Sequence, residues 1–542
     1  MILETEIDGL LYSLDTDEQE ATVVKCVDME RTEITIPEFF FYEGIVYEVT
    51  GIGECAFLLC KKLIVITIPK SITSIGKLAF YYCSSLASIT IPVDTTDIGN
   101  GIFACCDSLT IITVDEGNIT YDSRGGCNAI IETNSNTLIA GCSTTLIPEG
   151  VKSIRKNSFN GCINLTNIKI PEGVTNIEDY AFNGCIRLST ANIPESVTSI
   201  GELAFENCRN LTTINIPNSL TNIKKGTFIG CSRLAVINIP ESVTCIGEDA
   251  FNGCNHLNFI NIPKKLTSIG KRAFKECYSL TAITIPESVM EIGHEAFYRC
   301  SGELVVNCQI PSASKAEEGT FYNGNFTKVI VSNKVSSIGK YAFYDCSSIT
   351  NITIPESITN IDEFAFFGCS SLTNIIIPES VTSIGEATFC NCQCLKTISL
   401  PQSVTTIKDF TFQDCYCLTD ITIPESITSI GDWAFSGCKC LTSIKIPKGV
   451  KNIGNGVFYE CFQLVNITIP ENSQLTSIGG ATFNSCYNLT DIYCNSKETP
   501  LAEESFSDLD LSHLTLHVPE SAMEAYKNTE PWCRFGTIVA IK

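Results

Sequence analysis

The sequence is poor in the residues that several common functional classes need. Its 542 residues include 36 Lys and Arg against 60 Asp and Glu, which gives a net charge of −24. Such a chain has no positive field to attract phosphate groups, which argues against nucleic acid or an anionic membrane as the main partner. It has four histidines, so there is little material for histidine-based catalysis or for histidine-rich metal sites.

Long apolar runs and targeting signals are also lacking. No run of about 18 apolar residues occurs, so the sequence predicts no membrane-spanning helix. The first six residues, Met1 to Glu6, contain neither a basic segment nor an apolar one, and as written they are not a secretory signal. Either the protein stays inside the cell, or the sequence is a mature form whose leader has been removed.

Motifs of catalysis are missing as well. No G-x-G-x-x-G, Walker loop or H-E-x-x-H is present. His256 and His294 lie in different repeats, His513 and His517 lie near the C-terminus, and none has a nucleophile motif beside it. We therefore expect a protein that is not an enzyme, with no catalytic residues, no cofactor and no metal.

What the sequence has in abundance is a 23-residue repeat. Its 30 cysteines include three series that advance in steps of 23, Cys60–Cys106, Cys162–Cys300 and Cys346–Cys461, and then Cys486 after a step of 25. In all 17 of these places a Phe stands three residues before the Cys. The unit reads approximately I-P-E-S-V-T-S-I-G-x-x-A-F-x-x-C-x-x-L-T-x-I-x.

The unit has a physical reading. Ile214 and Ile216 alternate with polar residues, which indicates a short strand with one buried face, and Pro217 ends its pairing. A second extended piece follows at positions such as Val197–Ile200, then a tight turn at Gly201. Residues 202–207 are too few for an independent helix, so we predict a single helical or 3₁₀ turn. One unit cannot bury its own apolar edge, and stacked units, called rungs below, form a solenoid.

These motifs resemble the BspA-like, treponemal-type leucine-rich repeats. The resemblance rests on the L-x-x-I-x-I-P strand, the I-G-x-x-A-F-x-x-C turn and the period of 23. It implies a right-handed leucine-rich-repeat superhelix with short parallel strands, single helical or 3₁₀ turns and β-rich caps at both ends. The flanks resemble the family's caps, so we expect an N-terminal β cap at 1–50, the solenoid at 51–490 and a C-terminal cap at 491–542.

Two places break the period. Residues 115–147 read as a β-hairpin insert that turns at Asn134-Ser135, and residues 301–332 hold a degenerate rung. Counting these, we expect about 19 or 20 rungs of about 4.8 Å each.

The cysteines divide into a regular ladder and scattered extras. We interpret the ladder as buried free thiols used for packing, because Cys is small and apolar. Cys394, Cys417 and Cys440 share one repeat position two residues after the ladder, which holds Asn210 or Arg233 elsewhere and should be exposed. A cysteine pair split between a buried and an exposed position cannot easily offer both sulfurs to one tetrahedral ion, so unassigned surface thiols are the favoured interpretation over a metal site or redox pair.

The hairpin contains the one cysteine pair whose spacing suggests a bond. If the turn centres on Asn134-Ser135, Ile131 faces Leu138 and Cys127 faces Cys142, within disulfide range. Both a disulfide and two reduced thiols fit this arrangement.

A column of acidic residues follows the repeat proline. Its members are Glu172, Glu195, Glu241, Glu287, Glu356, Glu379, Glu425 and Glu471. We interpret it as a solvated edge that keeps a long protein soluble. Calcium binding is the alternative, although one carboxylate per rung supplies few ligands for each ion.

The exposed strand position forms a polar row that is the candidate binding face. It holds Asn192, Asn215, Asn238 and Asn261, and two residues before the last two of these stand Val236 and Phe259. Threonine and asparagine tolerate exposed strands in any case, and single exposed aromatic residues are common. The functional hypothesis is a flat, weakly charged face in which Val236 and Phe259 anchor a partner.

Two functional hypotheses follow. The first is a non-enzymatic binding or adhesion protein that presents its repeat face to a protein or cell-surface partner, as the resemblance implies, since that family is typical of surface and secreted proteins. The second is an intracellular repeat scaffold for protein–protein interaction, and the missing leader leaves the cytoplasm open as a location. The sequence does not name the partner, because this kind of fold hosts many.

Overall fold

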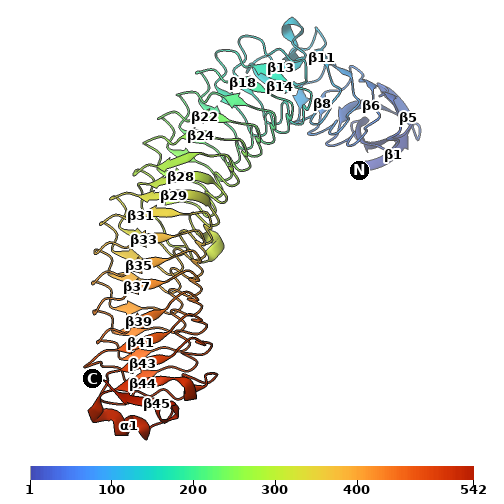
Figure 1. Ribbon diagram of the computed structural model, residues 1–542. Helices are drawn as coiled ribbons and strands as arrows, with labels where there is room; N and C mark the ends of the chain where they lie inside the picture. The colour runs from blue at the N-terminus through green and yellow to red at the C-terminus, as the bar shows by residue number, and fades with distance from the viewer. Residues whose placement is uncertain (1, 542) are drawn as a thin grey trace. The chain divides into compact units, whose positions relative to one another are not determined.

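The protein is a solenoid built mainly from short parallel strands, as predicted (Figure 1). The computed structural model describes residues 2–541 and contains about 21 turns. The chain divides into two compact units, Met1–Ser279 (unit 1) and Leu280–Lys542 (unit 2), and each is described by itself. None of the helices among residues 2–541 has the length and the apolar character needed to cross a membrane.

The strand predicted from the alternating isoleucines forms a parallel sheet in unit 1. Neighbouring strands are one repeat apart and in register, so that Val236 lies opposite Phe259 and Ile237 opposite Ile260. The central residue of each strand is buried and its neighbours face outward. The strands, in spatial order, are β16 (Asn167–Lys169), β18 (Thr190–Asn192), β20 (Thr213–Ile214), β22 (Val236–Asn238) and β24 (Phe259–Asn261).

The second extended piece of each rung forms another set of parallel strands, each two residues long. Its polar residue faces solvent and its Ile is buried, as at Ser199 and Ile200. In unit 1 these strands are β15 (Ser153–Ile154), β17 (Asn176–Ile177), β19 (Ser199–Ile200), β21 (Asn222–Ile223), β23 (Cys245–Ile246) and β25 (Ser268–Ile269).

Gly201 is required here by a close approach between rungs. A Cβ at this position would overlap the backbone of Glu178 and Asp179 in the preceding rung. The repeat glycine therefore sets how closely successive rungs can stack.

The segment predicted to be a helical or 3₁₀ turn is not helical, and that prediction is wrong. Leu203 and Asn207 both have φ of +56°, which breaks a right-handed helix. The N–H groups of Leu203, Phe205 and Asn207 instead donate to Lys225, Thr227 and Ile229 of the next rung, at 2.8–2.9 Å. The N–H groups of Glu206 and Cys208, which alternate with these, donate to Leu203 and Phe205 within the same turn. A single isolated unit cannot form this arrangement, because half of its bonds go to the next rung.

The helices of the described chain lie outside the regular repeat. They are η1 (Arg124–Gly126), η2 (Ala316–Glu318), η3 (Leu511–His513), η4 (Glu520–Ala522), α1 (Met523–Lys527) and η5 (Trp532–Arg534).

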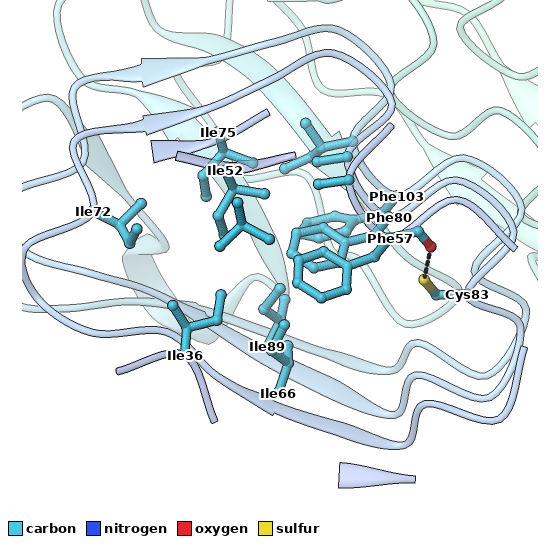
Figure 2. Close-up of a cluster of buried hydrophobic side chains, with 14 of the residues drawn as sticks. Ile36, Ile52, Phe57, Ile66, Ile72, Ile75, Phe80, Cys83, Ile89 and Phe103 are labelled. Atoms are coloured by element: carbon cyan, nitrogen blue, oxygen red, sulfur yellow. Dashed lines mark hydrogen bonds between the residues drawn. The ribbon is translucent and has the colours of Figure 1, made fainter. Parts of the chain in front are cut away.

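The Phe and Cys of each repeat form a continuous buried ladder. Figure 2 shows the rings of Phe57, Phe80 and Phe103 in a row. Phe57 and Phe80 are stacked, with centroids 5.2 Å apart, and Phe103 is tilted against Phe80, with centroids 5.9 Å apart. The thiol of Cys83 donates to the carbonyl oxygen of Phe57 in the preceding rung, at 3.1 Å. Each thiol therefore fills a small space in the core and also satisfies its own donor.

The same contact recurs along the ladder. Cys208, Cys231 and Cys254 are buried free thiols, and they donate to the carbonyls of Phe182, Phe205 and Phe228 at 3.2–3.3 Å. Burial raises the pKa of the Cys231 thiol to about 12. The expectation of buried thiols used for packing is confirmed at these positions.

At the N-terminal end the chain is mostly antiparallel. Strands β1 (Ile2–Ile7), β2 (Leu10–Asp15) and β3 (Glu20–Cys26) form a meander, and β5 (Phe39–Tyr42) and β6 (Ile45–Ile52) form a hairpin. Parallel pairing begins where β3 pairs with β6, and it continues where β6 pairs with β8 and β4 with β7. The first rungs contain β4 (Glu33–Thr35), β7 (Val65–Thr67), β8 (Ser74–Ile75), β9 (Ser88–Ile91), β10 (Asp97–Ile98) and β11 (Ile111–Val114).

The insert forms the predicted hairpin, but part of its predicted register is wrong. β13 (Ala129–Glu132) and β14 (Thr137–Gly141) are antiparallel, with Ile131 opposite Leu138 as expected. A bulge between Ile130 and Ile131 then shifts the pairing by one residue, so that Ala129 faces Gly141. Continued by one residue, the shifted register no longer sets Cys142 opposite Cys127, and the Cys142 thiol lies 3.5 Å from the carbonyl oxygen of Asn128.

The bulge removes the argument for a disulfide in the insert. Cys127 and Cys142 are both buried free thiols.

The hairpin pairs with strands on both sides. β12 (Tyr121–Asp122) pairs with β13, and β14 pairs in parallel with β15. The hairpin thereby joins the sheet of two-residue strands.

Unit 2 repeats the plan of unit 1. Its three- and four-residue strands are β26 (Ala282–Ile285), β31 (Asn351–Thr353), β33 (Asn374–Ile376), β35 (Thr397–Ser399), β37 (Asp420–Thr422), β39 (Ser443–Lys445) and β41 (Asn466–Ile469). Its two-residue strands are β27 (Glu291–Ile292), β30 (Ser337–Ile338), β32 (Asn360–Ile361), β34 (Ser383–Ile384), β36 (Thr406–Ile407), β38 (Ser429–Ile430), β40 (Asn452–Ile453) and β42 (Ser477–Ile478). The irregular stretch has longer parallel strands, β28 (Ser301–Val306) and β29 (Asn325–Val331).

The C-terminal strands continue the parallel stack. β43 (Asp491–Cys494), β44 (Thr515–Val518) and β45 (Thr537–Ala540) pair in sequence order, and Trp532 packs edge-on against Phe506 and Tyr526. β4, β44 and β45 pair in parallel although their segments lack the Phe-x-x-Cys pattern. Such turns explain why the structure has about 21 turns and the cysteine spacing predicts fewer.

The Phe ladder predicts a large loss of stability on truncation. Phe228 is 1% exposed and stacks between Phe205 and Phe251 at centroid distances of 5.8 and 5.5 Å. Phe228→Ala should lower the free energy of unfolding by about 3–5 kcal/mol through the cavity that it leaves. Phe259→Ala is the control, because that ring is 54% exposed. Urea unfolding measures both variants, and equal losses would contradict the ladder's role.

Candidate binding face

The outward side of the β16–β24 sheet contains all six predicted binding residues. Asn192 lies in β18, Asn215 directly follows β20, Val236 and Asn238 lie in β22, and Phe259 and Asn261 lie in β24. The register places Val236 beside Phe259 and Asn238 beside Asn261. The structure therefore brings the predicted set together on one sheet of unit 1.

Val236 and Phe259 form an exposed apolar pair in this face. Their exposed fractions are 45% and 54%, and the strands that carry them are held by parallel pairing on a buried Ile ladder. The side chains thus project from a rigid backbone, so a partner would order few degrees of freedom by contacting them.

A shallow groove of about 670 Å³ lies beside Val236 on the same face. Its lining combines polar side chains with the edges of buried Ile residues, and Lys169 is its single charged residue. It is lined by Asn167, Ile168, Lys169, Thr190, Ala191, Asn192, Thr213, Ile214, Asn215, Val236 and Asn238. The weak charge suits a contact made by shape, hydrogen bonds and apolar area.

The four asparagines do not play one role. Asn215 donates its amide to the carbonyl of Ile193 and accepts from the N–H of Ile193 at 3.0 Å. Asn261 makes the same pair of bonds to Ile239, both at 2.7 Å. These two asparagines therefore supply hydrogen-bond partners to the backbone N–H and C=O of an isoleucine in the preceding rung.

Asn192 and Asn238 keep their amides available. Both side chains are exposed, and within residues 2–541 neither makes a side-chain hydrogen bond. Sequence reasoning could not separate the two pairs, because all four asparagines stand in the same N-I-P context. Of the four asparagines, Asn192 and Asn238 are thus the two whose side-chain amides are not used within the protein.

The acidic column lies at an exposed edge, as expected. Four of its carboxylates, those of Glu195, Glu241, Glu379 and Glu425, accept a hydrogen bond from the backbone of the next rung. Glu195 accepts from the Asn218 N–H at 2.9 Å and Glu241 from the Lys264 N–H at 3.0 Å. The N–H of Lys448, donated to Glu425, lowers the pKa of that carboxyl. These carboxylates help to join rungs, and among residues 2–541 no group of three or more His, Cys, Asp or Glu could hold a metal ion.

Sequence reasoning missed a second, polar groove in unit 2. It has a volume of about 920 Å³ and lies over β34, β36, β38 and β40. Ser383, Thr406 and Ser429 line it together with acidic residues such as Asp409 and Asp432. The recurrence of an acid two residues after the buried Ile was the signal that could have indicated it. The Asp409 carboxylate accepts from the Asp432 N–H at 2.8 Å, so this row also joins rungs.

The exposed cysteine position is confirmed. Cys394 and Cys440 are exposed, and Cys417 between them is half-buried.

Two of the histidines have separate partners. His256 contacts the carbonyl of Ser232 at 2.7 Å, and His517 contacts the carboxylate of Asp491 at 2.7 Å. His517 lowers the pKa of the Asp491 carboxyl through this hydrogen bond.

Comparison with known proteins agrees with this architecture. Sequence models of the BspA type leucine-rich repeat region, in six copies, match residues 33–133, 131–258, 221–316, 314–423 and 405–530. These matches span far more than half of the chain, and the protein belongs to the BspA-type leucine-rich-repeat family. No curated protein matches the chain.

Solved structures of leucine-rich-repeat proteins are similar over most of the chain. A leucine-rich repeat protein from Bacteroides ovatus has 23% identity, covers 99% of this chain and 100% of its own, and has a TM-score of 0.32. A leucine rich cell surface protein from Faecalibacterium prausnitzii has 22% identity, coverage of 91% and 95%, and a TM-score of 0.22. The pneumococcal vaccine antigen PcpA has 15% identity, coverage of 100% and 98%, and a TM-score of 0.28.

The two asparagine roles predict different costs of substitution. Asn215→Ala should lower the free energy of unfolding by about 1–3 kcal/mol, because the buried N–H and C=O of Ile193 lose their partner. Asn192→Ala should change it by less than about 0.5 kcal/mol. Thermal or urea unfolding of the two matched variants checks this. An unchanged free energy of unfolding in Asn215→Ala would refute the idea that the Asn215 amide supports the backbone of Ile193.

Proposed function

We propose that this protein is a non-enzymatic binding protein that docks a protein partner on the outward face of β16–β24. The observation that carries the proposal is the exposed pair Val236 and Phe259, placed side by side on a rigid and weakly charged sheet. Leucine-rich-repeat families typically bind proteins, which supports this class of partner.

The chemistry of the face suits a protein surface. Aromatic side chains, Phe included, are enriched in protein interfaces relative to the rest of the surface, and the contacts around an anchor exclude water from it. Asn192 and Asn238 supply unused amides that can pair with a partner's backbone or side chains. Aromatic and aliphatic anchors on a sheet lose little conformational freedom when they are buried.

We place this binding at a cell surface, as adhesion. BspA-like leucine-rich-repeat proteins are typically surface or secreted proteins, and adhesion is the activity that the resemblance implies. The alternative is an intracellular scaffold, which is favoured by exposed free thiols such as Cys394, Cys440 and Cys533, because such thiols suit a reducing compartment.

A crosslinker at the proposed anchor tests the docking face. A photoreactive phenylalanine at position 259, in cells that express the protein, should capture a partner, and the same residue at the 83% exposed Ile376 should not. The purified partner should then bind Phe259→Asp about 30-fold more weakly than the wild type, the effect expected of an anchor. Ile376→Asp is the matched control. Equal affinities for wild type and Phe259→Asp would remove this face from the proposal.

The compartment is tested separately. Surface biotinylation of intact native cells, followed by fractionation, should label the protein if adhesion is its role. Recovery only in the unlabelled soluble fraction would contradict adhesion and favour the scaffold, and it would leave the docking face itself unaffected.

A further inference from the structure

Three thiols form a column on the surface of unit 2. Cys394, Cys417 and Cys440 occupy the same position on three consecutive rungs. The first and last are exposed, and the middle one is half-buried. Ladder cysteines such as Cys415 and Cys438 are buried and donate to Phe389 and Phe412, whereas within residues 2–541 the three column thiols have no hydrogen-bond partner.

Backbone hydrogen bonds fix the spacing of this column. The N–H of Cys417 donates to the carbonyl of Gln393 at 3.0 Å, and the N–H of Cys440 donates to that of Tyr416 at 3.1 Å. Each carbonyl belongs to the residue just before the equivalent cysteine of the preceding rung. These cysteines lie in turns, but the hydrogen bonds hold them at the stacking distance of hydrogen-bonded backbones, about 4.7–4.9 Å. The Cα atoms of neighbouring column cysteines are therefore about that far apart, and those of the outer two about twice as far.

This separation suits an ion that takes two sulfur ligands in a line. Metal–thiolate bonds of about 2.3 Å place two sulfurs about 4.6 Å apart across a linear ion. Soft monovalent ions such as Cu(I) prefer thiolates and accept this low coordination number. An ion that needs three or four ligands finds no suitable group of His, Cys, Asp and Glu among residues 2–541.

We propose that the thiol column is a binding site for a soft monovalent metal ion of the Cu(I) class, held by two neighbouring thiolates. Cys417 is common to both pairs, Cys394–Cys417 and Cys417–Cys440. On binding, two S–H groups lose their protons to solvent and two metal–sulfur bonds form. The bis-thiolate complex carries one negative charge, and no oxidation or reduction takes place.

A cation lies next to the column. The Lys439 ammonium is 4.2 Å from the centre of the Tyr416 ring, so it reaches back to the rung of Cys417. Lys439 and Tyr416 directly precede Cys440 and Cys417 in the chain. A positive charge here favours the anionic complex over the two neutral thiols.

The central position of Cys417 gives a sharp test. Cu(I) binding to the full chain is measured anaerobically, with a reductant present, by competition with a chromogenic Cu(I) chelator. Cys417→Ser should weaken the tightest site by about 100-fold or more, the loss expected when one of two tethered ligands is removed. Cys394→Ser and Cys440→Ser each leave one neighbouring pair and should stay within about threefold of the wild type.

Controls separate this site from the other thiols. Cys533→Ser removes an exposed cysteine outside the column and should bind like the wild type, and circular dichroism confirms that each variant is folded. Ag(I) needs no reductant to stay monovalent, and it should reproduce the pattern when the reductant is left out. The proposal is overturned if Cys417→Ser binds Cu(I) like the wild type. It is also overturned if all three column variants lose affinity equally, because two thiols would then be insufficient.

Discussion

The structure depends on one constraint, which is that a 23-residue rung cannot supply partners for its own backbone amides, its Phe ring and its thiol. Its turn segment leaves amides such as those of Leu203 and Phe205 without partners, and the next rung supplies the carbonyls. Its Phe ring needs a ring on each side, and its thiol needs the preceding Phe carbonyl. Every rung therefore completes its neighbours, and stability is a property of the stack.

This constraint also divides the surface into two kinds of residue. Some exposed polar side chains are used to join rungs, as Asn215 joins Ile193 and Glu195 joins Asn218. Others, such as Asn192, Val236 and Cys394, leave their polar or apolar groups facing solvent. Because the backbone repeats in register, residues at one repeat position line up on successive rungs with fixed spacing, as Val236 and Phe259 do on the docking face and the three cysteines do in the thiol column.

The sequence alone predicts the parts of the fold that each unit contains. The period, the buried Ile214 and Ile216, the hidden ladder thiols and the shared face of Val236 and Phe259 all follow from residue type and spacing. The turn at 202–207 was mispredicted because its amides bond to another rung, which local propensity cannot show. The one-residue bulge at Ile130 is invisible for a similar reason, since it is set by the packing of the insert. The division between Asn192 and Asn215 has no local signal at all.

Hydrogen–deuterium exchange of the native protein tests the central claim most directly. The amides of Phe205, Phe228 and Phe251 lie in turns that are neither helix nor strand, yet each donates to the following rung at 2.8–2.9 Å. If stacking between rungs holds the molecule together, these amides should be among the slowest to exchange. Exchange as fast as that of the exposed loop at Ile119 would contradict the account, because the turns would then be open to solvent and the stack held by its strands alone.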